Sequence, residues 1–246
     1  MERSNPALQP TRLRAAAQEA TAADGVMTLG GTVAKAFVLV LLTIASAGYT
    51  WYQYQLGNAQ NLNVLLGVGF LGGFVVAMVA IFKPRTSPYT GPLYAVLEGM
   101  ALGGVSAVIN ARYHGLPVLA VSLTLGVFVA MLALYVTRII RATERTWAIV
   151  GTATLGIAVY YLIALVLGMF GVQAPLIQDS GPLGIAFSLF VVGIAAFNLI
   201  LDFGLIEDGL QAGAPKYMEW YCAFGLLVTL AWLYLELLRL LRKLRR

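Results

Sequence analysis

Long uncharged stretches divide this chain of 246 residues into segments of membrane-spanning length. No Asp, Glu, Lys or Arg occurs within residues 36–82, 113–137, 146–178 and 180–201. About 18 to 20 consecutive apolar residues are enough for a helix to cross the hydrocarbon core of a bilayer. The pattern therefore predicts an all-α polytopic membrane protein. We expect seven transmembrane helices, over residues 33–52, 63–82, 92–111, 117–138, 147–170, 182–204 and 218–240.

The first 30 residues differ from the rest of the chain. They are polar and Ala-rich, and no apolar segment precedes residue 33. A cleavable signal peptide would need such a segment. We expect residues 1–30 to form a disordered cytoplasmic tail and residues 31–246 to form the membrane domain.

Prolines and glycines indicate how the predicted helices begin and pack. Pro92, Pro117 and Pro182 stand at the starts of their segments, where a missing N–H group costs little. Two Gly-x-x-x-Gly motifs, at 69–73 and 99–103, lie in the second and third segments. This spacing lets helix backbones approach closely in a membrane and predicts a compact bundle.

Composition excludes an ordinary water-soluble domain. The chain is 60% hydrophobic and 11% charged, with a mean hydropathy of +0.82, whereas a soluble domain carries roughly 25% charged residues. The formal net charge of +5 comes from basic residues at the ends of the predicted helices. Such placement is typical of contact with lipid headgroups, so the expected partner is the bilayer and no nucleic acid is expected.

The basic residues also predict an orientation. Loops on the side of the N-terminus hold nine Lys and Arg residues, and loops on the opposite side hold only Arg112. Because cytoplasmic loops are the richer in basic residues, the N-terminus is expected to be cytoplasmic. The basic C-terminus (Arg239, Arg242, Lys243, Arg245, Arg246) departs from this rule if the last segment crosses fully. The alternative is a segment that re-enters without crossing, and we favour full crossing because residues 218–240 are long enough to span.

Acidic residues in apolar segments need an explanation, because a carboxylate inside a bilayer costs roughly several kcal/mol unless it is paired, hydrated or protonated. Glu98, Asp202 and Glu219 are expected toward the cytoplasmic side. Glu207 and Asp208 fall in a predicted loop, where solvation explains them, and solvation at the interface beside Trp220 is the simpler interpretation of Glu219 as well.

Asp202 is the strongest candidate for a functional carboxyl group. It follows the apolar residues 199–201, and Asn198 lies one turn earlier as an expected hydrogen-bond partner. Burial favours the neutral form of a carboxyl group, and a second carboxyl nearby strengthens this preference. Loss of a shared proton would expose oxygen ligands suited to a hard cation such as Ca²⁺. The sequence thus predicts a pH-gated cation path, with Asp202 as proton sensor and Ca²⁺ ligand.

Glu236 is expected to act separately. It lies 17 residues beyond Glu219, about 25 Å along a helix, and therefore near the opposite face of the membrane. Arg239 is three residues further on and on the same helix face. We expect an ion pair between Glu236 and Arg239 that latches or anchors the last helix.

Three motifs in this order resemble those of the Bax inhibitor-1 (transmembrane Bax-inhibitor-motif) family, in its bacterial-type branch. They are LEGMALGG at 97–104, LDFGLIEDG at 201–209 and YLELLRLLRKL at 234–244. The resemblance covers about residues 30–246. It implies a seven-helix fold with the C-terminal helix at the centre, located in the plasma membrane of a bacterium. It also implies a pH-sensitive Ca²⁺ leak governed by an Asp pair on the last two helices.

Asp202 matches the first Asp of that pair, and the second has two candidate registers. One register places it at Glu236 and the other near Thr229. We prefer Thr229, because Asp202 and Glu236 would lie near opposite ends of two antiparallel helices. The second acid is then missing from its position, and Glu98 or Glu219 would have to supply it.

Other functions are less well supported by the sequence. The resemblance also allows a non-conducting regulator that binds another membrane protein, for example a membrane protease. No enzymatic activity is expected, because the chain lacks HExxH, GxSxG and a phosphate-cradling glycine loop. Its single Cys and single His exclude a multi-Cys metal site, so we expect no cofactor, only Ca²⁺ as a transported ion.

Overall fold

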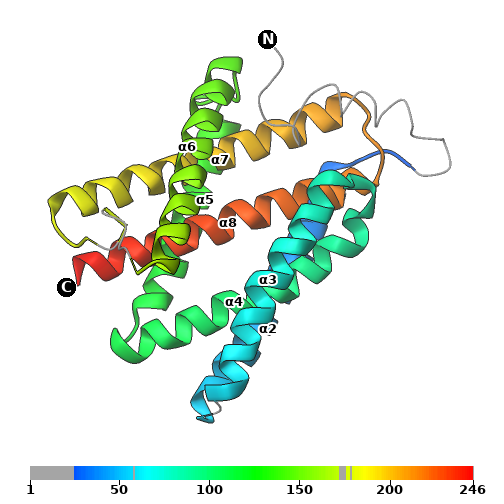
Figure 1. The fold of residues 1–246 in the computed structure, drawn as a ribbon. Coiled ribbons are helices and arrows are strands. Elements are labelled where there is room, and N and C mark those ends of the chain that lie inside the picture. The colour runs from blue at the N-terminus through cyan, green and yellow to red at the C-terminus, as the bar shows by residue number, and fades with distance from the viewer. Residues whose placement is uncertain (1–24, 58, 172–175, 178, 246) are drawn as a thin grey trace.

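Seven long helices make up most of the computed structural model, which describes residues 25–57, 59–171, 176–177 and 179–245 (Figure 1). Each of the seven is long and apolar enough to cross a membrane. A short 3₁₀ helix, η1 (Pro84–Thr86), precedes the third of them. The seven are α2 (Leu29–Gln55), α3 (Ala59–Phe82), α4 (Ser87–Arg112), α5 (Leu116–Val136), α6 (Glu144–Met169), α7 (Pro182–Gln211) and α8 (Tyr217–Leu244). The predicted all-α membrane fold is confirmed.

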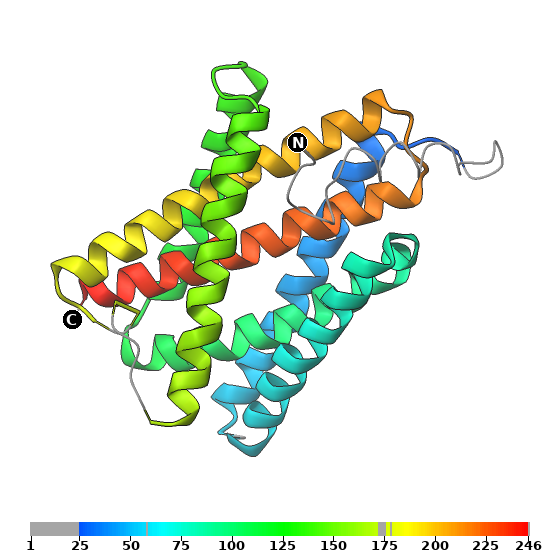
Figure 2. The same cartoon turned by 45° about the horizontal axis from the view of Figure 1, so that its top comes forward.

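The C-terminal helix α8 is central, as expected. It packs against α2, α4, α5 and α7, and Figures 1 and 2 both show it between α7 on one side and the α2–α4 group on the other. Buried residues follow one another along most of its length, from Met218 to Lys243. A helix that is covered by four neighbours is where polar side chains can be kept away from lipid.

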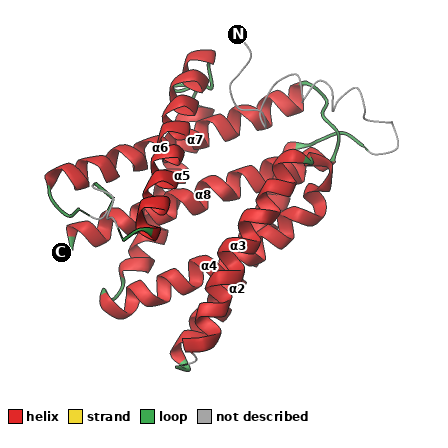
Figure 3. Cartoon of the chain, in the orientation of Figure 1, coloured by secondary structure: helices red, strands yellow, loops and turns green. Residues whose placement is uncertain are grey.

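Two helix boundaries differ from the sequence expectation. Pro92 does not open its helix, because α4 begins at Ser87 and Pro88 occupies the first turn. Helix α7 does not end near residue 204 but continues to Gln211, so Glu207 and Asp208 are helical rather than in a loop (Figure 3). Charged residues end a membrane span without ending a helix. The chain leaves the helix at Gly213, whose φ of 63° is the left-handed conformation common just after a helix C-terminus.

Glycines allow α4 to lie directly against α2 and α3. A Cβ atom on Gly99 or Gly103 would come within 2.3 Å of a backbone carbonyl oxygen of α2, that of Thr43 or Ala47 respectively. On Gly69 of α3 it would come within 2.8 Å of backbone atoms of α4. The close approach predicted from the glycine motifs is therefore present at these three positions.

The outer helices present apolar side chains to their surroundings. Large exposed residues occur on α3, α5 and α6, among them Leu71, Phe74, Val129, Ile149 and Leu162. In water such a surface would drive aggregation, whereas lipid tails accept it. The chain is an integral membrane protein.

Contacts at both ends of α8 show that it runs the full length of α7. At its start, the backbone N–H of Lys216 donates to the carbonyl of Gly25 at 3.1 Å, and Met27 donates to Ala214 at 2.8 Å. Residues 25–28, the end of the predicted tail, are thus fastened to the α7–α8 loop; residues 1–24 lie outside the described part. At its end, the Lys243 ammonium donates to the Gly184 carbonyl in the first turn of α7 at 2.8 Å.

Candidate functional site

Asp202 lies on the face of α7 that packs against α8. It is 9% exposed, and its neighbours on α8 are Cys222, Gly225 and Thr229. These three residues are spaced by three and four positions and therefore form one stripe along α8. Because Gly225 has no side chain, the carboxylate can approach the helix: a Cβ atom there would lie 3.9 Å from Asp202 Oδ1.

The Asp202 carboxyl group has few polar partners. The Thr229 hydroxyl is within hydrogen-bonding reach. Within the described part of the chain, Asp202 Oδ2 is buried and has no hydrogen-bond partner. A buried polar atom without a partner is uncommon and marks a strained or functional position.

Asn198 does not serve as the expected partner of Asp202. Its Nδ2 donates to Thr154 Oγ1 on α6 at 2.8 Å and to the Ile194 carbonyl at 2.9 Å. The two residues are four apart on α7, but Asn198 is turned toward α6 and Asp202 toward α8. This prediction was wrong because helix spacing alone does not tell which neighbour a side chain faces.

Asp202 lies farther from the end of its helix than the sequence suggested. It lies nine residues before Gln211, the last residue of α7, or about 13 Å along the helix axis. The expected distance was shorter because α7 was expected to end near residue 204. The extra length of α7 carries Glu207 and Asp208, so it moves the end of the helix away from Asp202 and not the end of the apolar segment.

Glu219 is a buried ion-pair residue rather than an interfacial acid. It is 0% exposed, forms an ion pair with Lys35 of α2, and accepts hydrogen bonds at 2.9 Å from both the N–H and the hydroxyl of Thr28. Thr28 caps the N-terminus of α2, where a negative charge is favourable. Gly31 leaves the space, since a Cβ there would come within 2.2 Å of Glu219 Oε1.

Glu98 occupies a third, separate position between α3 and α4. The Tyr94 hydroxyl one turn earlier donates a hydrogen bond to it, and a Cβ on Gly73 of α3 would lie 3.7 Å from its Oε2. The Tyr94 ring in turn packs edge-on against Phe224 of α8, with centroids 5.0 Å apart.

The three candidate carboxylates therefore have three different sets of partners. Asp202 faces the middle of α8, Glu219 faces the start of α2, and Glu98 faces α3. Among the described residues, no group of three or more His, Cys, Asp or Glu side chains could hold a metal ion. The residue beside Asp202 at the register preferred for the second acid is Thr229.

The ion pair between Glu236 and Arg239 is present, with a closest N–O distance of 2.8 Å. Glu236 is 1% exposed and also accepts from Tyr161 of α6 at 2.9 Å and from the Trp232 indole at 3.2 Å. The Arg239 guanidinium lies 4.8 Å from the centre of the Tyr161 ring. Glu236 is thus buried and, through Tyr161, joins α8 to α6, whereas the Arg239 side chain is only partly buried.

Two partners of the buried carboxylates, Lys35 and Tyr161, were not predicted from the sequence. Lys35 carried a usable signal, since a cation in an apolar span needs a counter-charge as much as an acid does. Tyr161 carried none, because its place in the chain resembles that of any tyrosine on a lipid-facing helix. Both depend on which helices pack together.

Comparison with known proteins gives one match, which covers nearly the whole chain. Residues 5–246 match the sequence model of the family described as Bax inhibitor 1 like. No curated protein and no solved structure gives a match.

Proposed function

Because the chain belongs to the Bax inhibitor 1 like family, we propose that it is a pH-sensitive cation leak pathway gated by protonation of Asp202. The observation that carries the proposal is the buried Asp202 carboxyl group at the α7–α8 contact, with one oxygen lacking a partner among the described residues. The membrane is that of a bacterial cell, and the N-terminus is cytoplasmic, as the nine-to-one distribution of basic residues favours.

The proposed gating follows from the free-energy cost of an ionised Asp202 side chain between α7 and α8. When Asp202 is protonated, the neutral side chain fits between α7 and α8 with little penalty. When it loses its proton, the carboxylate has the Thr229 hydroxyl as its single donor among the described residues, and a carboxylate so poorly compensated costs several kcal/mol. Separation of α7 from α8 relieves that cost by admitting water or a cation. Flux should therefore increase as the pH rises.

Ca²⁺ is proposed as the substrate that passes, not as a resident ion. A bound Ca²⁺ ion takes six to eight oxygen ligands, whereas Asp202 and Thr229 together offer three side-chain oxygens. A cation at this position would keep most of its water. Weak and partial ligation of this kind suits conduction, because an ion must leave as readily as it enters.

Ion flux into vesicles tests the proposal. The purified protein is reconstituted in liposomes that contain a Ca²⁺ indicator, and flux is measured across the neutral pH range. We expect wild-type flux to rise with pH and Asp202→Asn to remove this dependence, because Asn cannot ionise. Glu144→Gln, a change at an exposed acid in the first turn of α6, serves as control and should behave as wild type.

The only cysteine of the chain provides a second readout that does not depend on which ion passes. Cys222 is buried beside Asp202, so a hydrophilic thiol reagent reaches it only when α7 and α8 separate. At high pH, labelling should be fast in the wild type and slow in Asp202→Asn. At one pH, removing the Asp202 charge favours ionisation of the adjacent thiol and would by itself speed labelling, so slower labelling of Asp202→Asn reports closure and not thiol chemistry.

An unchanged pH dependence in Asp202→Asn would contradict the gate. A wild-type protein that conducts no ion at any pH would contradict the leak itself. The function to test would then be that of a non-conducting regulator, by co-purification of another membrane protein.

A further inference from the structure

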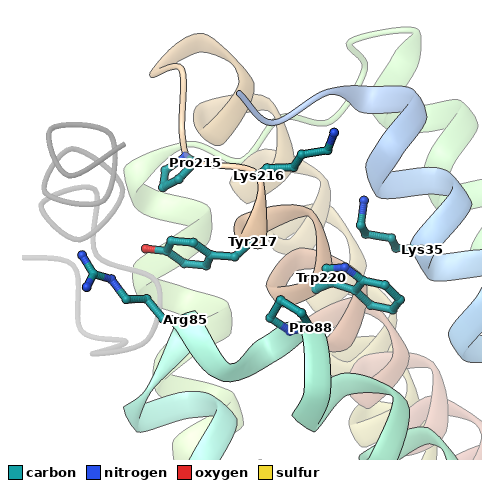
Figure 4. A pocket seen from close by; sticks show the side chains of 7 residues that line it. All are labelled: Lys35, Arg85, Pro88, Pro215, Lys216, Tyr217 and Trp220. Atoms are coloured by element: carbon teal, nitrogen blue, oxygen red, sulfur yellow. The ribbon is translucent and has the colours of Figure 1, made fainter. Parts of the chain in front are cut away.

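The short segment before α2, residues 25–28, lies across the loop that joins α7 to α8, and we call it the strap. Backbone hydrogen bonds join Gly25 to Lys216 and Met27 to Ala214. Figure 4 shows the ribbon that leads into α2 passing above Lys216. The strap therefore connects the beginning of α2 to the loop end of the α7–α8 pair.

The Met27 side chain anchors the strap between α7 and α8. It is 3% exposed and belongs to one buried apolar cluster with Leu205 of α7 and with Met218 and Cys222 of α8. Gly209 of α7 provides the space, because a Cβ atom there would lie 3.0 Å from the Met27 sulfur atom. A side chain buried among residues of both helices stabilises the arrangement in which the helices lie together.

The Met27 cluster reaches the candidate gate. Cys222, one of its members, lies beside Asp202. Gly209, against which Met27 packs, is seven residues from Asp202 along α7, or about 10 Å of helix axis. Because α7 is one continuous helix between these two positions, holding its end against α8 opposes separation of the two helices at Asp202.

A second attachment fixes the other end of the strap. Thr28, its last residue, donates to Glu219 of α8 through its N–H and its hydroxyl, both at 2.9 Å, and Glu219 is also paired with Lys35. Lys35 lines an open pocket of about 700 Å³ between the starts of α2, α4 and α8 (Figure 4). Water from this pocket can replace the hydrogen bonds of Thr28, so the strap can leave without stranding a buried carboxylate.

We propose that the strap keeps α7 and α8 together at Asp202, and that these helices separate only when the strap leaves the α7–α8 loop. The proposal rests on the function proposed above, in which an ionised Asp202 drives the two helices apart. The backbone bonds of the strap, the buried Met27 side chain and the Thr28 bonds all resist that separation. Opening therefore depends both on the carboxyl group of α7 and on the segment before α2.

A cross-link between the strap and the loop tests the proposal. Val26 and Pro215 form an antiparallel bridge. The hydrogen bonds on either side make them a non-hydrogen-bonded pair, whose Cα atoms lie about 4.5 Å apart, which a disulfide can span. The variant Val26→Cys, Pro215→Cys is combined with Cys222→Ser, so that a single intramolecular disulfide can form.

Ion flux is then measured in the Ca²⁺-indicator liposomes at high pH. We expect oxidation to reduce the flux of the double-cysteine variant to its low-pH level, because the strap can no longer leave, and reduction to restore it. Val26→Cys alone and Pro215→Cys alone, each with Cys222→Ser, are the controls. Their flux should not respond to oxidation.

Labelling of the native Cys222 tests the strap without any ion flux. At low pH, a hydrophilic thiol reagent should label Thr28→Val faster than the wild type, because the strap loses its hydroxyl bond to Glu219. We expect a rate about fivefold higher, the factor by which loss of one hydrogen bond favours opening. Thr143→Val is the matched control, since Thr143 also caps a helix, α6, and its hydroxyl accepts from the Thr146 N–H of that helix.

The outcomes separate the strap from the leak. Unchanged flux in the oxidised double-cysteine variant would overturn the strap and leave the leak in place, and two cysteines that do not cross-link would contradict the pairing of Val26 with Pro215. A wild type without flux would overturn the leak, and the labelling then decides on the strap alone. Equal labelling rates in Thr28→Val and Thr143→Val would overturn it.

Discussion

The acidic residues within this helix bundle differ in the partners that surround each carboxyl group. Glu219 and Glu236 each have a cationic partner and at least two further hydrogen-bond donors. Asp202 has the Thr229 hydroxyl and one oxygen without a partner in the described part. A fully compensated buried pair holds helices together, whereas a poorly compensated carboxyl group responds to a change in pH. This difference makes Asp202 a residue on which a switch can depend.

Thr229 should set the pH at which the proposed gate opens. Its hydroxyl is a donor that stabilises the Asp202 carboxylate, so Thr229→Val, which keeps the shape and removes the donor, makes ionisation harder. We expect the flux–pH curve to move to higher pH with the same maximum. Thr124→Val is the control, because Thr124 is also buried and its hydroxyl donates to the Ala120 carbonyl of its own helix. A shift to lower pH, or equal shifts in both variants, would show that Thr229 does not act through Asp202.

Asp202 could be recognised from the sequence as a candidate site, and its surroundings could be predicted only in part. An acid directly after three apolar residues stands out in any sequence, and antiparallel packing of the last two helices already favoured Thr229 over Glu236 as its neighbour. The partners of Glu219 could not be derived in that way. Lys35 and Glu219 are 184 residues apart, and only the packing of α2 against α8 brings them together.

Elements pack in this protein through small residues, and the α2–α4 contact is the clearest case. Gly99 and Gly103 are one turn apart on α4 and touch Thr43 and Ala47, one turn apart on α2. The Thr43 hydroxyl also donates across the contact to the Ala95 carbonyl at 3.1 Å. The matching order of these pairs shows that α2 and α4 run parallel. Their backbones meet without intervening side chains.

Gly103→Ala should force α2 and α4 apart. The new methyl group would lie 2.3 Å from the Ala47 carbonyl oxygen, and a backbone atom cannot move aside as a flexible side chain can. Overpacking of this kind costs about 3 kcal/mol, measurable as a lower midpoint of thermal unfolding in detergent. Gly126→Ala on α5, where a Cβ would meet nothing within 4 Å, is the matched control. Equal midpoints for the two variants would contradict the close packing.

The number of helices was predictable at this scale, as were the starts of α5 and α7 at Pro117 and Pro182, whereas the start of α4 and the end of α7 were not. A bilayer of fixed thickness imposes a minimum length on every apolar segment, so seven segments give seven helices. Helix ends depend on local backbone chemistry instead. Pro88 rather than Pro92 occupies the first turn of α4, and Gly213 rather than the charged residues of α7 ends that helix.

In the whole molecule, the start and the end of α8 contact different parts of the helix bundle. The start of α8 is fastened to residues 25–27 at the beginning of α2. The end of α8 contacts the α4–α5 and α6–α7 connections, since Arg245 donates to the His114 carbonyl at 3.1 Å and Lys243 donates to the Leu176 carbonyl at 2.5 Å. At 28 residues, α8 is about 42 Å long, more than the roughly 30 Å of a hydrocarbon core. Full crossing therefore fits the contacts better than a re-entrant segment.

Labelling of introduced cysteines in intact cells tests this arrangement, because the native Cys222 is buried and should react slowly. Arg245→Cys and Ala212→Cys replace exposed residues beyond the end of α8 and before its start. With the N-terminus in the cytoplasm, a membrane-impermeant thiol reagent should label Arg245→Cys in intact cells, and Ala212→Cys only after permeabilisation. Labelling of both positions only after permeabilisation would favour re-entry, and the basic C-terminus would then obey the charge rule that full crossing breaks.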